Sequence, residues 1–166
     1  MNMLIFACCQ LLAAVPCPWT PMTVSDGRVG VWGREYAFAS NALPVSVTSL
    51  GRELLAGPLR VVCADKDGRP VAWTKHGSWV HAADEKSATV CGWSESSAVT
   101  VDAVTRIEYD GMMEVSLALV PGPAGHKSQL TKVWLEIPLK PELVRYYQYY
   151  PFPWGKCENA GGVKGP

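Results

Sequence analysis

Carboxylates are the first residues whose spacing suggests chemistry, because glycoside cleavage needs a pair of them at one site. Glu108, Asp110 and Glu114 lie close together around one Asp-Gly dipeptide, and Glu136 lies in a later apolar run. Residues 106–119 alternate between apolar and polar side chains, which is typical of strands with one buried face. Glu108 and Glu114 fall on the polar side of that alternation, and Asp110 belongs to the turn. A solvated sheet face and a turn therefore explain them, and the sequence predicts no catalytic residue.

The histidines and the common nucleotide-binding and nucleophile motifs point to no further chemistry. His76 and His81 are two candidate metal ligands, whereas catalytic zinc sites usually have three protein ligands. Surface histidines are the favoured interpretation. The sequence contains no Gly-x-Ser-x-Gly nucleophile elbow, no phosphate-binding P-loop and no Gly-x-Gly-x-x-Gly dinucleotide motif. We therefore expect neither a metal nor a cofactor.

The cysteines leave the redox compartment open. Six are present, at positions 8, 9, 17, 63, 91 and 157, and none forms a Cys-x-x-Cys motif. Cys63 and Cys91 each lie in an apolar run, where a free cysteine packs as a small hydrophobic residue. Buried free thiols are the favoured interpretation, and a Cys63–Cys91 disulfide is the alternative if the chain is secreted.

Aromatic residues offer two kinds of binding surface. Trp73, Trp79 and Trp93 lie in strand-like runs, where packing in the core is the favoured interpretation. The Pro-containing segment 146–154 has no alternation that assigns its aromatic rings to a core. An interdomain packing surface explains that segment best, and a platform that stacks on sugar rings is the alternative. The candidate contact residues are Tyr149, Tyr150, Phe152 and Trp154.

The elements that would position these residues are short antiparallel strands. Asp110-Gly111 between two alternating runs predicts a long hairpin over residues 98–120 with a type I′ turn. About ten strand-like runs separated by turn signals are typical of a sandwich or barrel. They include 29–38, 44–48, 53–55, 59–64, 71–74, 78–82, 88–93 and 130–137. Asp65-Lys-Asp-Gly-Arg-Pro70 predicts a turn after the run 59–64, because Asp and Gly favour turns and Pro70 ends it. The predicted fold class is an all-β antiparallel β-sandwich with minimal helix, the one candidate helix being residues 141–146.

Size, charge and composition suggest one domain, flanked by N-terminal and C-terminal segments of different composition. The chain has 166 residues, 15 basic and 15 acidic, and no basic run, so we expect no nucleic-acid partner. The apolar stretch 3–15 is too short for a transmembrane helix, which needs about 20 residues. No basic residue precedes it, so a signal peptide is not convincing. The localisation stays unknown, with a secreted or periplasmic location as the open alternative. We expect an irregular or signal-like segment at 1–28, a sandwich at 29–145 and an aromatic exit segment at 146–166.

Several motifs resemble a known family. Ile107-Glu-Tyr-Asp-Gly-Met-Met-Glu-Val115, Val133-Trp-Leu-Glu-Ile-Pro-Leu139 and Tyr146-Tyr-Gln-Tyr-Tyr150 resemble the N-terminal β-sandwich of glycoside-hydrolase-like proteins. Those proteins are related to the β-N-acetylgalactosaminidases of glycoside hydrolase family 123. Val31-Trp-Gly-Arg-Glu-Tyr36 and Leu54-Leu-Ala-Gly-Pro58 are similar to the same family, so the resemblance covers roughly residues 29–160.

The resemblance implies a division of labour within a larger protein. In such proteins the sandwich precedes a (β/α)8 barrel, whose Asp-Glu pair uses the acetamido group of the substrate. No catalytic residue of that family can be transferred to these positions. We therefore expect a non-catalytic domain that packs against a downstream barrel of a parent glycoside hydrolase. The alternative is a carbohydrate-binding module that uses Trp and Tyr stacking.

Overall fold

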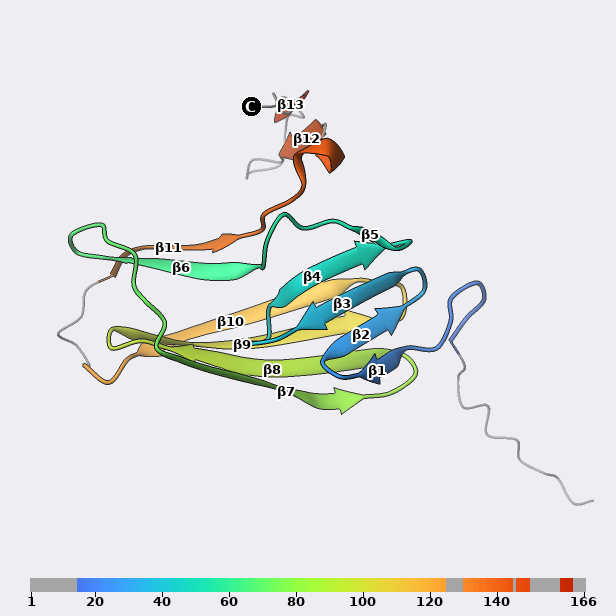
Figure 1. Ribbon diagram of the computed structural model, residues 1–166, viewed down its shortest axis with the longest axis horizontal. Coiled ribbons are helices and arrows are strands. Elements are labelled where there is room, and N and C mark those ends of the chain that lie inside the picture. The colour runs from blue at the N-terminus through green and yellow to red at the C-terminus, as the bar shows by residue number, and fades with distance from the viewer. Residues whose placement is uncertain (1–14, 125–129, 145, 150–158, 163–166) are drawn as a thin grey trace, which may run out of the picture.

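The computed structural model describes residues 15–124, 130–144, 146–149 and 159–162, and these form an antiparallel β-sandwich (Figure 1). One layer contains a five-stranded sheet in the order β1-β2-β3-β4-β5. Its strands are β1 (Thr23–Ser25), β2 (Arg28–Val31), β3 (Arg34–Phe38), β4 (Pro44–Ser49) and β5 (Arg52–Glu53). The predicted all-β sandwich is confirmed.

The facing layer is a four-stranded sheet of long strands in the order β10-β9-β8-β7. Its strands are β7 (Lys75–Ala83), β8 (Ser87–Glu95), β9 (Val99–Glu108) and β10 (Met113–Pro121). A further pair, β6 (Arg60–Asp65) with β11 (Leu130–Glu136), lies on the same side of that sheet as β1–β5 (Figure 1). A 3₁₀ turn, η2 (Pro141–Leu143), then leads to the hairpin of β12 (Tyr146–Tyr149) and β13 (Asn159–Gly162).

The core lies between the two layers, and strand β9 shows its pattern most clearly. Every second residue of β9 is buried, as the alternation of the sequence predicts: Val99, Val101, Ala103, Thr105 and Ile107. Thr105 is the one polar member, and its hydroxyl donates to the carbonyl of Ala42 in the opposite layer. Burial of such side chains is the main favourable contribution to folding, about 25 cal/mol per Å² of apolar surface.

The β9–β10 hairpin is present, but its turn is not the predicted type I′ turn. Ile107 is opposite Met113, and the N–H of Glu108 donates to the Met112 carbonyl at 2.9 Å, so the loop holds the three residues 109–111 rather than two. The N–H of Gly111 donates to Glu108, as in a type I turn, and only Gly111 has a positive φ, of 84°. A type I turn followed by a left-handed glycine is the usual three-residue hairpin connection. The carbonyl of Gly111 accepts hydrogen bonds from Arg34 and Tyr36, which hold this geometry.

Three further local predictions require correction. Strand β1 pairs with β2 through Asp26-Gly27, so the sheet begins before the boundary expected at residue 29. The strand expected over 29–38 is two strands, because Gly33 adopts a positive φ of 70° and reverses the chain. Residues 71–74 form no strand, since the segment after the Pro70 bridge makes only isolated hydrogen bonds. In the described part of the chain, no helix is long and apolar enough to cross a membrane.

Candidate functional site

The contact with a sugar or a neighbouring domain that the sequence predicts for four aromatic residues remains a prediction. Tyr149 ends β12, whose backbone pairs with β13. Tyr150, Phe152 and Trp154 lie outside the described residues.

The carboxylates beside the hairpin are explained by ion pairing on a solvated face. Arg106 lies on the outer face of β9, 3.1 Å from Glu108. The same arginine is directly opposite Glu114 on β10. Arg106 thus shares the outer face with both carboxylates and is ion-paired with Glu108.

The described histidines and cysteines form no reactive cluster. His76 and His81 are exposed on β7, and no group of three or more His, Cys, Asp or Glu within the described ranges could hold a metal ion. Cys63 and Cys91 are both free thiols, as the favoured interpretation expected, but only Cys63 is buried, whereas Cys91 is half-buried. Cys63 is buried, and burial raises the pKa of its thiol.

Two of the three strand tryptophans face away from the core, contrary to prediction. Trp93 alternates with buried residues of β8 and lies opposite Gly77, so it is on the outer face of the sheet. Trp79 is opposite Cys91 on the same outer face and is 52% exposed. Trp73 packs against the core, although it lies in no strand.

A shallow pocket of about 360 Å³ is lined by residues of β6, of β11 and of the segment that follows the turn at 65–70. Two tryptophans and an ion pair line it, together with small apolar residues. We call it the tryptophan pocket, and it is lined by Arg60, Val61, Val62, Pro70, Val71, Trp73, Trp134 and Glu136. It joins residues from three separate stretches of the chain.

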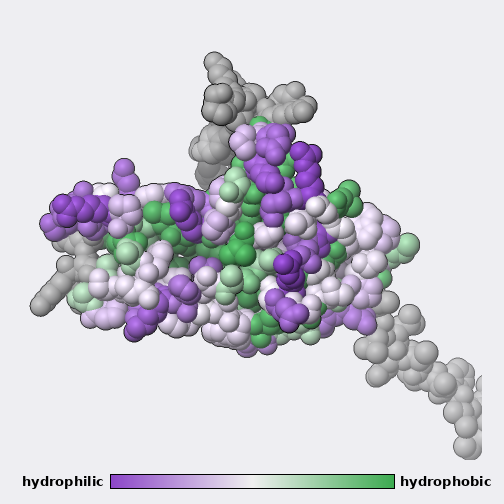
Figure 2. All heavy atoms as spheres, viewed as in Figure 1, coloured by the Kyte–Doolittle hydropathy of each residue, from purple (hydrophilic) through white to green (hydrophobic). Residues whose placement is uncertain are grey.

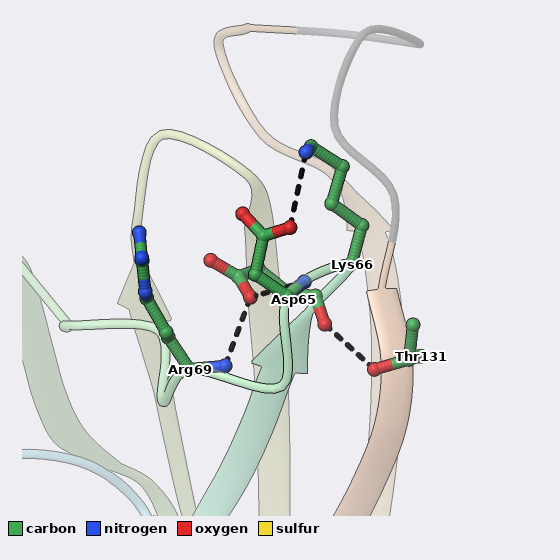
Figure 3. A network of polar contacts seen from close by, with 5 residues as sticks. Asp65, Lys66, Arg69 and Thr131 are labelled. Carbon is green, nitrogen blue, oxygen red and sulfur yellow. Dashed lines mark hydrogen bonds and ion pairs between the residues drawn. The ribbon is translucent and has the colours of Figure 1, made fainter.

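A tight turn after β6 positions the first wall of the tryptophan pocket (Figure 3). One carboxylate oxygen of Asp65 accepts the N–H groups of Asp67, at 2.8 Å, and Arg69, at 2.9 Å. The Arg69 N–H bond is the main reason that the pKa of Asp65 is lowered. From β11, the Thr131 hydroxyl donates to the Asp65 carbonyl at 2.7 Å (Figure 3). The predicted turn at 65–70 is thus confirmed, and it brings the chain back along β6.

The returning segment fixes the orientation of Trp73. The N–H of Val71 donates to the Cys63 carbonyl at 2.8 Å, so residues after the turn run beside β6. The indole N–H of Trp73 donates to the Val61 carbonyl at 3.1 Å. The nitrogen of this indole is therefore satisfied by the backbone, and its remaining carbon edge and faces are apolar.

Strand β11 supplies the second wall and the charged pair. Trp134 is opposite Val62 and Glu136 is opposite Arg60, so all four side chains share one face. The carboxylate of Glu136 accepts the indole N–H of Trp134 at 2.9 Å and the Nε–H of Arg60 at 2.6 Å. These two bonds, that from Trp134 first, lower the pKa of Glu136. The pocket thus presents two oriented indoles beside a neutralised ion pair, an arrangement suited to binding.

A second surface consists of apolar side chains along β11 and the segment that follows it. We call it the exit run; its members are Val133, Leu135, Ile137 and Leu139, each between 38% and 52% exposed. Backbone hydrogen bonds join this stretch to the loop after β5, at Ala56 to Pro138 (2.7 Å) and Lys140 to Leu54 (3.0 Å). In Figure 2, hydrophobic residues on the viewed face gather between the layers and continue toward the segment before β12. The exit run is therefore an exposed but ordered apolar surface.

A family model described as "Glycoside hydrolase 123, third domain" matches residues 22–159. The chain belongs to this family. The match begins one residue before β1 and includes the tryptophan pocket and the exit run, so both are parts of this third domain. The relation to glycoside hydrolase family 123 that the motifs suggested is confirmed. No curated protein and no solved structure matches the chain.

Proposed function

We propose that this glycoside hydrolase 123 third domain is a non-catalytic accessory domain that packs against and supports a (β/α)8 barrel in the same polypeptide. The exit run is the observation that supports this proposal most directly. Its apolar side chains are exposed where the sandwich ends and the chain continues toward residues 146–166. In the proposed organisation, that aromatic segment connects the sandwich to the barrel.

The size of the exit run supports domain packing. Four aliphatic side chains are each about half exposed, and full burial of one such side chain contributes about 1.5–3 kcal/mol. Completing the burial of all four would contribute about 3–6 kcal/mol, enough to orient a neighbouring domain.

The described carboxylates also support a non-catalytic role. Glu53 and Asp65 accept backbone N–H groups, and Glu136 is paired with Arg60. Glu108 is paired with Arg106. Each of these groups thus has a structural partner in the described part of the chain.

Hydrogen exchange tests the packing surface. The protection of residues 132–139 is compared between this chain and a longer protein that adds the barrel to it. We expect slower exchange at these residues in the longer protein, because the barrel would cover the exit run. Unchanged exchange along 132–139 would contradict the proposal.

A pair of substitutions tests the same surface by stability. Ile137→Ser removes an exit-run side chain and Met112→Ser, in the β9–β10 turn, is the matched control with similar exposure. In the two-domain protein, Ile137→Ser should remove about 1 kcal/mol of apolar burial at the interface. The melting temperature of the barrel should therefore fall by a few degrees. Met112→Ser should leave it unchanged. Equal effects of both substitutions would show that the exit run has no special role.

The alternative function, a carbohydrate-binding module with a platform of Tyr149, Tyr150, Phe152 and Trp154, stays a prediction.

A further inference from the structure

We propose that the tryptophan pocket binds one neutral pyranose ring, with the sugar stacked on Trp134 and its hydroxyls bonded to Glu136 and Arg60. This site shares no residue with the predicted platform in 146–154. It also does not depend on packing against a barrel.

The indoles provide the apolar part of the site. Trp134 is 40% exposed, yet its ring is held in place because its N–H donates to Glu136. Trp73 is held in the same way by the Val61 carbonyl. With both N–H groups satisfied, the pocket side of each ring is a hydrocarbon surface, and Val62 and Pro70 extend it. Ordered aromatic faces are the surfaces against which the C–H face of a sugar packs.

The ion pair provides the polar part of the site. An ionised carboxylate has about four acceptor positions and a guanidinium has five N–H donors. In the described contacts, Glu136 accepts two hydrogen bonds and Arg60 donates through Nε. Acceptors of Glu136 and the terminal nitrogens of Arg60 thus remain for a ligand. Adjacent sugar hydroxyls can donate to the carboxylate and accept from the guanidinium at the same time.

Charge and size specify the class of ligand. The lowered pKa of Glu136 keeps it ionised at neutral pH, so its charge cancels that of Arg60. A pocket with no net charge favours a neutral sugar over a uronic acid or a sulfated sugar. The volume of about 360 Å³ is at the lower end of small-molecule sites, about 300–1,000 Å³, which suits a single ring.

The test follows the indole N–H signals of the full chain in ¹H–¹⁵N spectra during titration with D-galactose, D-glucose and N-acetyl-D-galactosamine. We expect the signals of Trp73 and Trp134 to shift with a millimolar dissociation constant for at least one sugar. Trp134→Ala should weaken binding by about tenfold or more, the contribution of one stacked ring. Trp79→Ala removes an exposed indole from the other layer and should leave binding unchanged.

A second variant separates loss of binding from loss of folding. Glu136→Gln preserves the size of the side chain and should weaken binding several-fold while the thermal unfolding curve stays close to that of the unmodified chain. The proposal is overturned if no indole signal shifts at about 100 mM sugar, where even very weak sites fill. It is also overturned if Trp134→Ala and Trp79→Ala weaken binding equally, or if galacturonate binds more tightly than every neutral sugar.

Discussion

At the scale of single residues, Glu53 shows how this chain uses a carboxylate as a structural group. Its side chain accepts the N–H of Val47 at 3.1 Å and of Leu55 at 2.8 Å, and it also accepts the hydroxyl of Ser46. Burial alone would raise the pKa of Glu53, but these bonds and one from Leu54 outweigh it, so the pKa lies below its ordinary value of 4.5. The sequence predicted a strand here but no partner for the carboxylate, because the donors come from β4 and the following loop.

The pKa of Glu53 makes the stability of the domain depend on pH. The folded state prefers the ionised carboxylate, so its contribution is complete above pH 4.5 and is lost as the pH falls through the lower folded-state pKa. Glu53→Gln should reduce the free energy of unfolding at pH 7 by about 1 kcal/mol, since the carboxylate is partly solvated. Between pH 5 and pH 3 the variant should also lose less stability than the unmodified chain, by about 1 kcal/mol. Urea unfolding at each pH measures both differences.

The exposed Glu85→Gln is the matched control for this measurement, and it should behave like the unmodified chain. If the free energy of unfolding of Glu53→Gln depended on pH as that of the unmodified chain does, the Glu53 carboxylate would not contribute to the pH dependence.

At the scale of elements, the same dipeptide forms two different turns. Asp26-Gly27 has positive φ at both residues, 48° and 72°, and closes β1–β2 as a two-residue turn. Asp110-Gly111 closes a three-residue turn, in which only the glycine is left-handed. The dipeptide predicts that the chain reverses. The turn type depends on register, which the burial of Ile107 and the hydrogen bonds to the Gly111 carbonyl determine.

Strand β8 contains a position where the two layers approach closely enough to require glycine. A Cβ atom on Gly92 would lie 2.5 Å from the Ala42 nitrogen and 2.8 Å from the Gly77 carbonyl oxygen. Both neighbours are backbone atoms, so Gly92→Ala should destabilise the domain by about 2–3 kcal/mol in chemical denaturation, the cost of an overpacked core. In Gly57→Ala the nearest atom is the side-chain Cγ of Pro138 at 3.6 Å, an ordinary contact. A change below about 0.5 kcal/mol for Gly92→Ala would contradict the packing of these layers.

At the scale of the whole molecule, the core is continuous from the five-stranded sheet to β6 and the facing sheet. Cys63 of β6 belongs to it together with Val29 of β2 and Ile107 of β9, and all three are fully buried. The β6–β11 pair therefore extends the sandwich and forms one body with it. For that reason the tryptophan pocket and the exit run both lie on a stable base.

Thiol labelling can report the stability of this core. Cys63 is buried and its pKa is raised, whereas Cys17 is exposed. Because Cys63 should react only when the sandwich opens, its alkylation by iodoacetamide should be at least about a thousandfold slower than that of Cys17. Peptide mass spectrometry of the labelled chain measures both rates. Rates within about tenfold of each other would mean that β6 opens without global unfolding.

The sequence by itself determined the antiparallel strands, the turn at 65–70, the buried face of β9 and the relation to glycoside hydrolase family 123. Alternation and turn residues are local signals, and they act within a few neighbours along the chain. Only the tertiary structure decided that Trp79 and Trp93 face outward and that Trp73 and Trp134 line one pocket with Arg60 and Glu136. The reason is that β6 pairs with β11 across more than sixty intervening residues, and a local pattern does not specify which distant strand pairs with which.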